Sequence, residues 1–185
     1  MKLKVIKLNQ VTSTNDKAIE MIRKKNFKPK LLVSKKQTKG KGTMGKKWIS
    51  REGNLFISIF FETKVKPEDI SIINPYIVKK VLDKYTKYKI KVKWPNDLIV
   101  KRKKLSGILQ ETIRYKSRSF LIIGIGINTI YAPLNKNFKS IALSNFSKKR
   151  IKNSEILRDI KDLYEKFISD INLNKISFLK KKYIK

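Results

Sequence analysis

The chain has 185 residues and a formal net charge of +32, because 46 lysines and arginines outnumber 14 aspartates and glutamates. It contains no cysteine and no histidine, which excludes disulfides, thiol catalysis, histidine general bases and metal sites built from either residue. Its length and 41% apolar content indicate one domain over residues 1–185, and no apolar run is long enough to span a membrane.

The N-terminal third of the chain alternates predicted strands with one predicted helix. Residues 3–8 alternate apolar and polar side chains like a strand, without the apolar core of a signal peptide. A helix is expected to follow the possible caps at 12–16 and to run to about residue 25. Residues 31–33 predict a short buried strand, 35–47 a loop rich in glycine and lysine, and 55–61 a strongly apolar strand.

The remaining residues predict paired strands between helices. Helical spacing covers 67–88, where Pro75 either kinks the helix or marks its start. An irregular polar region is expected at 132–150. Four strands should precede it and two helices should close the chain: strands near 90–93, 97–101, 105–113 and 119–127, helices at 155–171 and 175–183. This order predicts an α+β fold with a mixed or antiparallel sheet covered by helices on one face.

Residues 93–109 read KWPNDLIVKRKKLSGIL and carry the strongest chemical signal. They predict a hairpin with a strand to about 100, a basic turn over 101–104 and a return strand from 105. Lys104 and the Asn96-Asp97 pair would then face one pocket. A lysine and a carboxylate converging on a concave site suit an enzyme that handles a phosphate and a nucleophile. The alternative is a surface hairpin with a charged tip.

Three further segments have both a functional and a structural interpretation. The glycines of QTKGKGTMGKKW (37–48) can form an anion nest or simply a flexible basic loop. The alternate glycines of GIGINT (124–129) can leave a groove for a flat ligand or mark a bulge in a core strand. Ser13-Thr14-Asn15 can bind a ligand or only cap a helix.

The positive charge alone is a weak indication of nucleic-acid binding. Lysine supplies 39 of the 46 basic residues and is spread over every segment, whereas base-edge recognition favours arginine forks. Compositional bias explains such a distribution, although a nucleic-acid-binding module is retained as an alternative. The charge should still accelerate encounter with acidic partners.

Taken in order, the blocks STN, QTKGKGxxGKxW, GNLFxS, KWPNDL, KxxGIL and GIGIN resemble the catalytic domain of biotin protein ligases, over roughly residues 10–180. The resemblance implies the biotin/lipoyl protein ligase catalytic-domain fold and a biotin–[acetyl-CoA-carboxylase] ligase (EC 6.3.4.15). Such an enzyme joins biotin and ATP, with Mg²⁺, into biotinyl-5′-AMP. It then transfers biotin to a lysine of the biotin carboxyl carrier protein of acetyl-CoA carboxylase. A cytoplasmic location, a possible homodimer, and no specific DNA or membrane partner are expected.

The resemblance also implies roles for individual residues. Lys104 would neutralise the reacting carboxylate and α-phosphate, and Asp97 would orient the incoming lysine amine or a metal ion whose ligands are otherwise unspecified. Gly126 would line the pocket through its backbone. The implied biotin-binding residues are Ser13, Thr14, Asn15, Gln37, Gly40, Lys41, Gly42, Thr43, Trp48, Lys104, Gly107, Leu109 and Gly124. The implied ATP- or adenylate-binding residues are Lys41, Thr43, Lys46, Trp48, Asn96, Lys104 and Asn128.

Three departures from the family pattern carry expectations. The usual loop is GRGRxGR, whereas residues 40–46 read GKGTMGK, and Thr43 stands where many relatives have arginine. The adenylate should therefore be held less tightly than in arginine-bearing relatives. No helix-turn-helix is expected before the first strand and no β-barrel domain after Lys185, so a ligase without an operator is expected.

The rival enzyme is a lipoate or octanoyl ligase or transferase, whose RRxSGGG stretch is absent.

Overall fold

The structure is a computed structural model that describes residues 1–134, 138–147, 150–173 and 176–184. Parts of the predicted irregular region at 132–150, and residue 175, where the last helix was expected to begin, lie outside these ranges. None of the helices in the described ranges combines the length and the hydropathy that a bilayer span requires.

A single seven-stranded sheet forms the centre of the fold, in the order β1-β2-β3-β7-β6-β5-β4. Only β1 and β2 are parallel, and every other neighbouring pair is antiparallel, so the predicted mixed sheet is confirmed. The strands are β1 (Lys4–Val11), β2 (Lys30–Gln37), β3 (Leu55–Glu62), β4 (Lys91–Lys93), β5 (Asp97–Val100), β6 (Lys103–Tyr115) and β7 (Arg118–Ile127).

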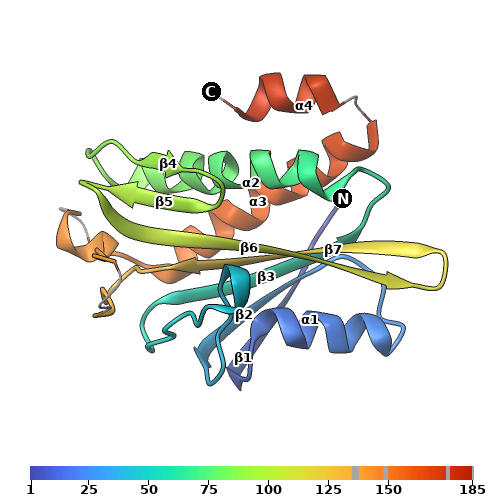
Figure 1. The fold of residues 1–185 in the computed structure, drawn as a ribbon, viewed down its shortest axis with the longest axis horizontal. Coiled ribbons are helices and arrows are strands. Elements are labelled where there is room, and N and C mark those ends of the chain that lie inside the picture. The colour runs from blue at the N-terminus through green and yellow to red at the C-terminus, as the bar shows by residue number, and fades with distance from the viewer. Residues whose placement is uncertain (135–137, 148–149, 174–175, 185) are drawn as a thin grey trace.

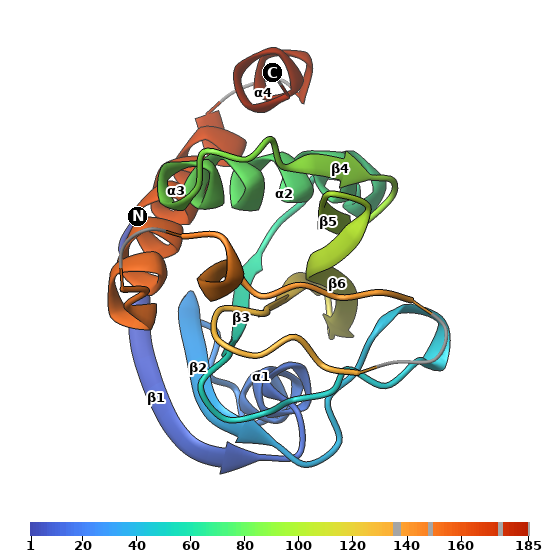
Figure 2. The same cartoon turned by 90° about the vertical axis from the view of Figure 1, so that its left-hand side faces the viewer.

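Helices lie on both faces of this sheet (Figures 1 and 2). The helix α1 covers part of one face, while α2 and α3 pack on the opposite face, with α4 beyond them. The helices are α1 (Thr14–Arg23), α2 (Pro67–Leu82), α3 (Asn153–Leu173) and α4 (Ile176–Tyr183), and single 3₁₀ turns span Thr43–Gly45, Asp83–Tyr85 and Leu143–Asn145.

The expectation that helices cover only one face was wrong, because β3 is apolar on both sides. Its residues Ile57 and Ile59 point into the larger core under α2 and α3. Phe60 points the other way, into a smaller core with Ala18 and Ile22 of α1. Side chains alternate across a strand, so an uninterrupted apolar run requires cover on both faces. Since α1 covers only part of its face, the remainder is free to hold a site.

Most predicted elements lie within a few residues of the observed ones, with three informative differences. The strand β2 continues to Gln37 through residues expected in a loop, because it pairs with β1 over this length. The helix α2 starts at Pro67 and runs through Pro75, which is buried in the apolar face of the helix. The β5–β6 turn is reduced to Lys101 and Arg102, both at positive φ, the geometry of a tight hairpin.

Candidate active site

The floor of the site is the part of the sheet face that α1 leaves open. Cross-strand partners place Phe56, Gly126 and Gly107 in one row over β3, β7 and β6. The next row consists of Ser58, Gly124 and Leu109. Because these glycines have no side chains, other groups approach the sheet closely. A Cβ at Gly124 would lie 2.5 Å from Asn15 Oδ1, and one at Gly126 would lie 2.4 Å from Trp48 Cε2.

One end of the site is a polar wall at the start of α1. Ser13 is the N-cap, and its hydroxyl accepts hydrogen bonds from the Asn15 and Asp16 N–H groups. The helix-cap interpretation of Ser13 is therefore confirmed, and Ser13 lines the pocket as well. Gln37, at the end of β2, accepts from the Thr14 N–H at 2.8 Å and donates to Ser50 at 2.9 Å.

Below this wall, Ser58 of β3 joins the buried polar groups. Its hydroxyl lies 2.7 Å from Thr14 Oγ1 and also contacts Asn15 Oδ1. Asn15 in turn donates from Nδ2 to Glu111 Oε2 of β6 at 2.6 Å. Ser58 is fully buried, and Thr14 and Asn15 nearly so. The side-chain oxygens of Thr14 and Asn15 thus have partners within the protein, which is required where polar groups leave water.

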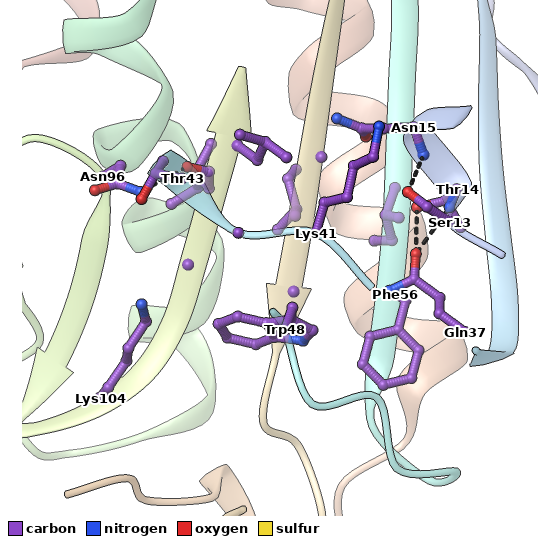
Figure 3. A pocket seen from close by; sticks show the side chains of 18 residues that line it. Ser13, Thr14, Asn15, Gln37, Lys41, Thr43, Trp48, Phe56, Asn96 and Lys104 are labelled. Carbon is purple, nitrogen blue, oxygen red and sulfur yellow. Dashed lines mark hydrogen bonds between the residues drawn. The ribbon is translucent and has the colours of Figure 1, made fainter. Parts of the chain in front are cut away.

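The opposite end of the site is cationic. Lys104, at the start of β6, places Nζ 2.7 Å from Asp97 Oδ1 across the hairpin, as predicted. The contact is an ion pair rather than a well-aligned hydrogen bond, since Oδ1 lacks a partner of hydrogen-bonding geometry. Asn96 fixes the hairpin by donating from Nδ2 to the Ile108 carbonyl at 3.0 Å. Figure 3 shows Lys104 and Asn96 on one side of the pocket and the polar wall on the other.

A segment distant in sequence completes the cationic end. Residues 138–142 run beside the start of β6, where the Lys104 N–H donates to the Lys139 carbonyl at 2.9 Å. Phe138 thereby reaches Lys104, whose Nζ lies 5.3 Å from the ring centroid. Asn128 donates to the Lys104 carbonyl at 3.3 Å, and its buried Oδ1 has no partner among the described residues.

Trp48 lies between the two ends (Figure 3). Its indole rests on the sheet where Gly107 and Gly126 leave room, and Lys104 Nζ is 5.4 Å from its ring centroid. The indole Nε1 is buried and has no partner among the described residues. The pocket that remains has a free volume of about 40 Å³, which holds a few water molecules.

The segment 38–48 that carries Trp48 is a folded turn. Lys41 and Lys47 form a bridge, the Gly42 N–H donates to the Lys46 carbonyl at 2.6 Å, and the turn between them uses positive φ at Met44. The Lys41 ammonium binds the Asp16 carboxylate and lies 3.8 Å from Glu111. The hydrogen bond to Asp16 raises the pKa of Lys41, against an opposing effect of burial. Lys41 is therefore a cation at neutral pH.

The structure brings most of the predicted site residues to one pocket. These are Ser13, Thr14, Asn15, Gln37, Lys41, Gly42, Thr43, Trp48, Asn96, Lys104, Gly107, Leu109, Gly124 and Gly126. Four predicted residues do not line it. Gly40 packs against the Trp48 carbonyl and Ser50, Lys46 lies on the outer side of the turn, Asp97 sits behind Lys104, and Asn128 lies beneath Lys104.

The predicted residues omit four apolar ones that line the pocket, Phe56, Ile57, Ile108 and Ile125. They also omit three residues that contact the pocket residues: Ser58, Glu111 and Phe138. Strand alternation places Glu111 on the same face as Leu109 two residues earlier, and Ser58 on the face of Phe56, so both had a sequence signal. Phe138 had none, because it arrives from an irregular segment. Within the described ranges no three carboxylates, histidines or cysteines are grouped as a metal site.

Comparison with known proteins assigns the family. The sequence profile of the biotin/lipoate A/B protein ligase family matches residues 7–128. The bifunctional ligase/repressor BirA of Bacillus subtilis (strain 168) is 30% identical over 169 residues, which cover 86% of this chain and 52% of that protein. The chain thus spans about half the length of this relative.

Solved structures match over nearly the whole chain. A mutant biotin protein ligase from Aquifex aeolicus in complex with biotin has a TM-score of 0.80 and 28% identity, covering 99% of this chain and 77% of that one. The Aquifex aeolicus enzyme in complex with biotin and ATP has a TM-score of 0.74 and 27% identity, covering 97% and 76%. With a profile match over more than half of its length, the chain belongs to the biotin/lipoate A/B protein ligase family.

Proposed function

We propose that the protein is a biotin–[acetyl-CoA-carboxylase] ligase that forms biotinyl-5′-AMP and transfers biotin to a carrier lysine. The observation that carries the proposal is one pocket with a buried polar wall at one end and Lys104 at the other (Figure 3), where Asp97 pairs with Lys104 from outside the pocket lining. A ureido ring needs hydrogen-bond partners when buried, and an acyl phosphate reaction needs a cation at the reacting end. The relatives that bind biotin and ATP support the same assignment.

In the first step, a biotin carboxylate oxygen attacks the α-phosphorus of ATP. The new bond joins that oxygen to phosphorus, the bond to the β-phosphate bridging oxygen breaks, and pyrophosphate leaves with the electron pair. Two anions must approach for this reaction. The Lys104 ammonium, half-enclosed by Trp48 and Phe138, is placed to offset their repulsion and the charge on the pentacoordinate phosphorus.

In the second step, the neutral amine of a carrier lysine attacks the carbonyl carbon of the adenylate. An amide bond forms, the bond from the carbonyl carbon to the phosphate oxygen breaks, AMP leaves with that electron pair, and the nitrogen releases its proton to water. Asp97 is the carboxylate adjacent to Lys104 and is assigned to orient the amine. With neither histidine nor cysteine in the chain, this chemistry rests on lysine, carboxylate and water.

Mg²⁺ is proposed to accompany ATP. This ion commonly binds through one or two carboxylates together with substrate phosphates, so it does not need a cluster of protein ligands. Asp97 offers one carboxylate beside Lys104, and Asn96 offers an amide oxygen nearby. Asp97 and Asn96 therefore fit a Mg²⁺ ion that takes most of its ligands from the ATP phosphates and water.

Binding of biotin requires Trp48 to move. The indole occupies the space between the two ends of the pocket, where a ligand that reaches from the polar wall to Lys104 has to lie. Because Trp48 belongs to the turn at 38–48, this segment is the element that must open and then close on the ligand. On closure, a hydrogen-bond acceptor of the ligand would satisfy the buried indole Nε1.

The proposed protein partner is an acidic carrier domain. A groove of about 1410 Å³ adjoins the Lys104–Asp97 pair, with exposed Trp94 and Met44 at its rim, 77% and 92% exposed. Its cations are Lys46, Lys47, Lys93, Lys101, Arg102, Lys103, Lys104 and Lys139. Transfer to a biotin carboxyl carrier domain should therefore slow steeply as salt is raised, and salt-independent transfer would contradict the charge argument.

The experiment that tests the function is ATP–pyrophosphate exchange by the purified protein. Exchange that requires biotin is expected, and lipoate or octanoate should not replace it. Exchange with lipoate or octanoate alone would instead assign a lipoate-type ligase of the same family. Biotin should also raise the melting temperature, because a ligand that binds only the folded state stabilises it. A folded protein that binds DNA or RNA tightly and shows no exchange would support the nucleic-acid-binding alternative.

A further inference from the structure

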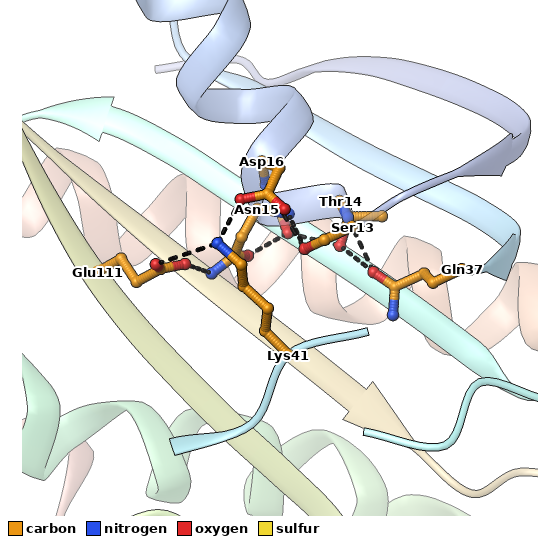
Figure 4. A network of polar contacts seen from close by, with 8 residues as sticks. Ser13, Thr14, Asn15, Asp16, Gln37, Lys41 and Glu111 are labelled. Carbon is orange, nitrogen blue, oxygen red and sulfur yellow. Dashed lines mark hydrogen bonds and ion pairs between the residues drawn. The ribbon is translucent and has the colours of Figure 1, made fainter. Parts of the chain in front are cut away.

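Glu111 of β6 connects two parts of the site that are otherwise separate in sequence (Figure 4). One oxygen, Oε2, accepts a hydrogen bond from Asn15 Nδ2 at 2.6 Å in the polar wall. The other, Oε1, lies 3.8 Å from the ammonium of Lys41, which belongs to the turn at 38–48. The same ammonium binds Asp16, in the first turn of α1. One carboxylate thus faces both the wall and the turn.

The first contact fixes the orientation of the Asn15 amide. A carboxylate only accepts, so it requires the amide nitrogen to point toward it. The Asn15 oxygen then points to Ser58, whose hydroxyl can donate to it. The reversed amide would place Oδ1 against the Glu111 carboxylate, which is repulsive. The Thr14 hydroxyl donates to Gln37 Oε1 at 3.0 Å and its oxygen lies 2.7 Å from the Ser58 hydroxyl, so the Asn15 amide is tied to the rest of the wall through Ser58.

The second contact holds the turn in place. Lys41 is the cation of this turn that binds acidic groups of both α1 and β6, while Trp48 at the end of the same turn fills the pocket. Glu111 is 29% exposed, so its charge is less screened than at a free surface. Movement of the turn, which binding of biotin requires, must break or rearrange these ion pairs.

We propose that Glu111 is a positioning residue that fixes the Asn15 amide for ligand binding and, through Lys41, couples the polar wall to the turn at 38–48. It does not line the pocket itself, and it acts through two side chains that do, Asn15 and Lys41. The ligand class rests on the proposed function, biotin being the ureido compound that the wall would bind. The coupling of wall and turn rests on the contacts alone.

The experiment compares Glu111→Ala, Glu111→Gln and Asp16→Asn with the wild type. Hydrogen exchange of peptides covering 38–48, measured without ligand, is expected to be several-fold faster in all three, because each removes a charge that holds Lys41. Biotin affinity, measured by calorimetry, should fall about tenfold in Glu111→Ala through loss of a charge-assisted hydrogen bond. It should be largely restored in Glu111→Gln, whose amide oxygen can still accept from Asn15.

Glu62→Ala is the matched control. Glu62 also lies on a strand and pairs with one cation, Arg118, at 2.5 Å, but it does not line the pocket. Unchanged exchange and unchanged biotin affinity in Glu111→Ala would overturn the proposal, and so would an equal effect in the Glu62 control. If the wild type binds no biotin, the proposed function fails, and the exchange measurement in ligand-free protein still decides whether Glu111 couples the wall to the turn.

Discussion

The two ends of the pocket differ in how completely their polar groups are satisfied. At the polar wall, the side-chain oxygens of Thr14, Asn15 and Gln37 have hydrogen-bond partners within the protein. At the cationic end, the buried Oδ1 of Asn128 has no hydrogen-bond partner among the residues that the structure describes, and Asp97 Oδ1 has the Lys104 ion pair but no aligned hydrogen bond within that part of the chain. A wall that is already satisfied is a rigid, preformed surface, whereas an end with unmet polar groups gains from a ligand.

The two ends should therefore control different properties, the wall both stability and binding, and the cationic end mainly activity. Removing a group from the wall leaves a buried partner unsatisfied in the free protein, so both stability and binding should fall. Removing a group from the cationic end affects mostly what happens when substrates are present.

Lys104→Ala should lower biotin-dependent pyrophosphate exchange by about 10²–10³-fold, the range found when one charge-stabilising donor is removed from a transition state. The free energy of unfolding should change by about 1 kcal/mol or less, because the ion pair with Asp97 is partly exposed, 20% on each side. The rate of pyrophosphate exchange measures the activity, and urea unfolding measures the free energy of unfolding. A loss of stability in proportion to activity would show that the cationic end is structural.

Ser58→Ala should lower both the stability of the fold and the affinity for biotin. Ser58 is fully buried, and its hydroxyl contacts both Thr14 Oγ1 and Asn15 Oδ1. Its removal leaves Asn15 Oδ1 without this donor and should destabilise the fold by about 1–3 kcal/mol. Biotin affinity should fall about tenfold by calorimetry, since the amide is no longer held. Ser71→Ala, a half-buried serine on α2 that does not line the pocket, is the control and should change neither. Lost affinity with unchanged stability would contradict a preformed wall.

The sequence predicted the fold to a large extent because its local signals agree with one another. The apolar strand at 55–61, the hairpin around Lys101, and the helices at both ends were all recognisable from period and turn chemistry. The sequence analysis did not predict that helices cover both faces of the sheet, although the uninterrupted apolar run of β3 indicates this. Of the two alternatives for Pro75, a kink or the start of the helix, the second was wrong, because the buried face of α2 continues on both sides of this residue.

The site was predictable where residues adjoin in sequence and unpredictable where the fold alone joins them. Ser13-Thr14-Asn15 and the Lys104–Asp97 pair each lie on one local unit, and both were identified. Phe138 reaches Lys104 through pairing of an irregular segment with the start of β6, which no spacing in the sequence encodes. That Trp48 fills the pocket depends on glycines from two other strands.

Thr43→Arg should sharpen the contrast by adding charge near the cationic end. Thr43 lines the pocket, whereas the adjoining Met44 is 92% exposed and does not. An arginine at 43 can form a bidentate contact with the adenylate phosphate, so release of biotinyl-5′-AMP without an acceptor should slow about tenfold. Met44→Arg is the control, with little change expected. Release from the wild type as slow as from Thr43→Arg would refute the view that this turn holds the adenylate loosely.

Glu165→Gln tests a region outside both ends, where stability should change without activity. On α3, burial raises the pKa of Glu165, but hydrogen bonds from Lys161 and the Leu3 N–H lower it more, so the pKa of this carboxyl lies below its ordinary value. A carboxylate with a lowered folded pKa contributes stability above its unfolded pKa and loses it as the pH falls through the folded value. The wild type should therefore exceed the variant by about 1 kcal/mol near pH 7, and this difference should shrink below about pH 4. Urea unfolding at both pH values measures it, with pyrophosphate exchange at pH 7 unchanged. A difference independent of pH would mean that packing, and not the charge of Glu165, stabilises this helix.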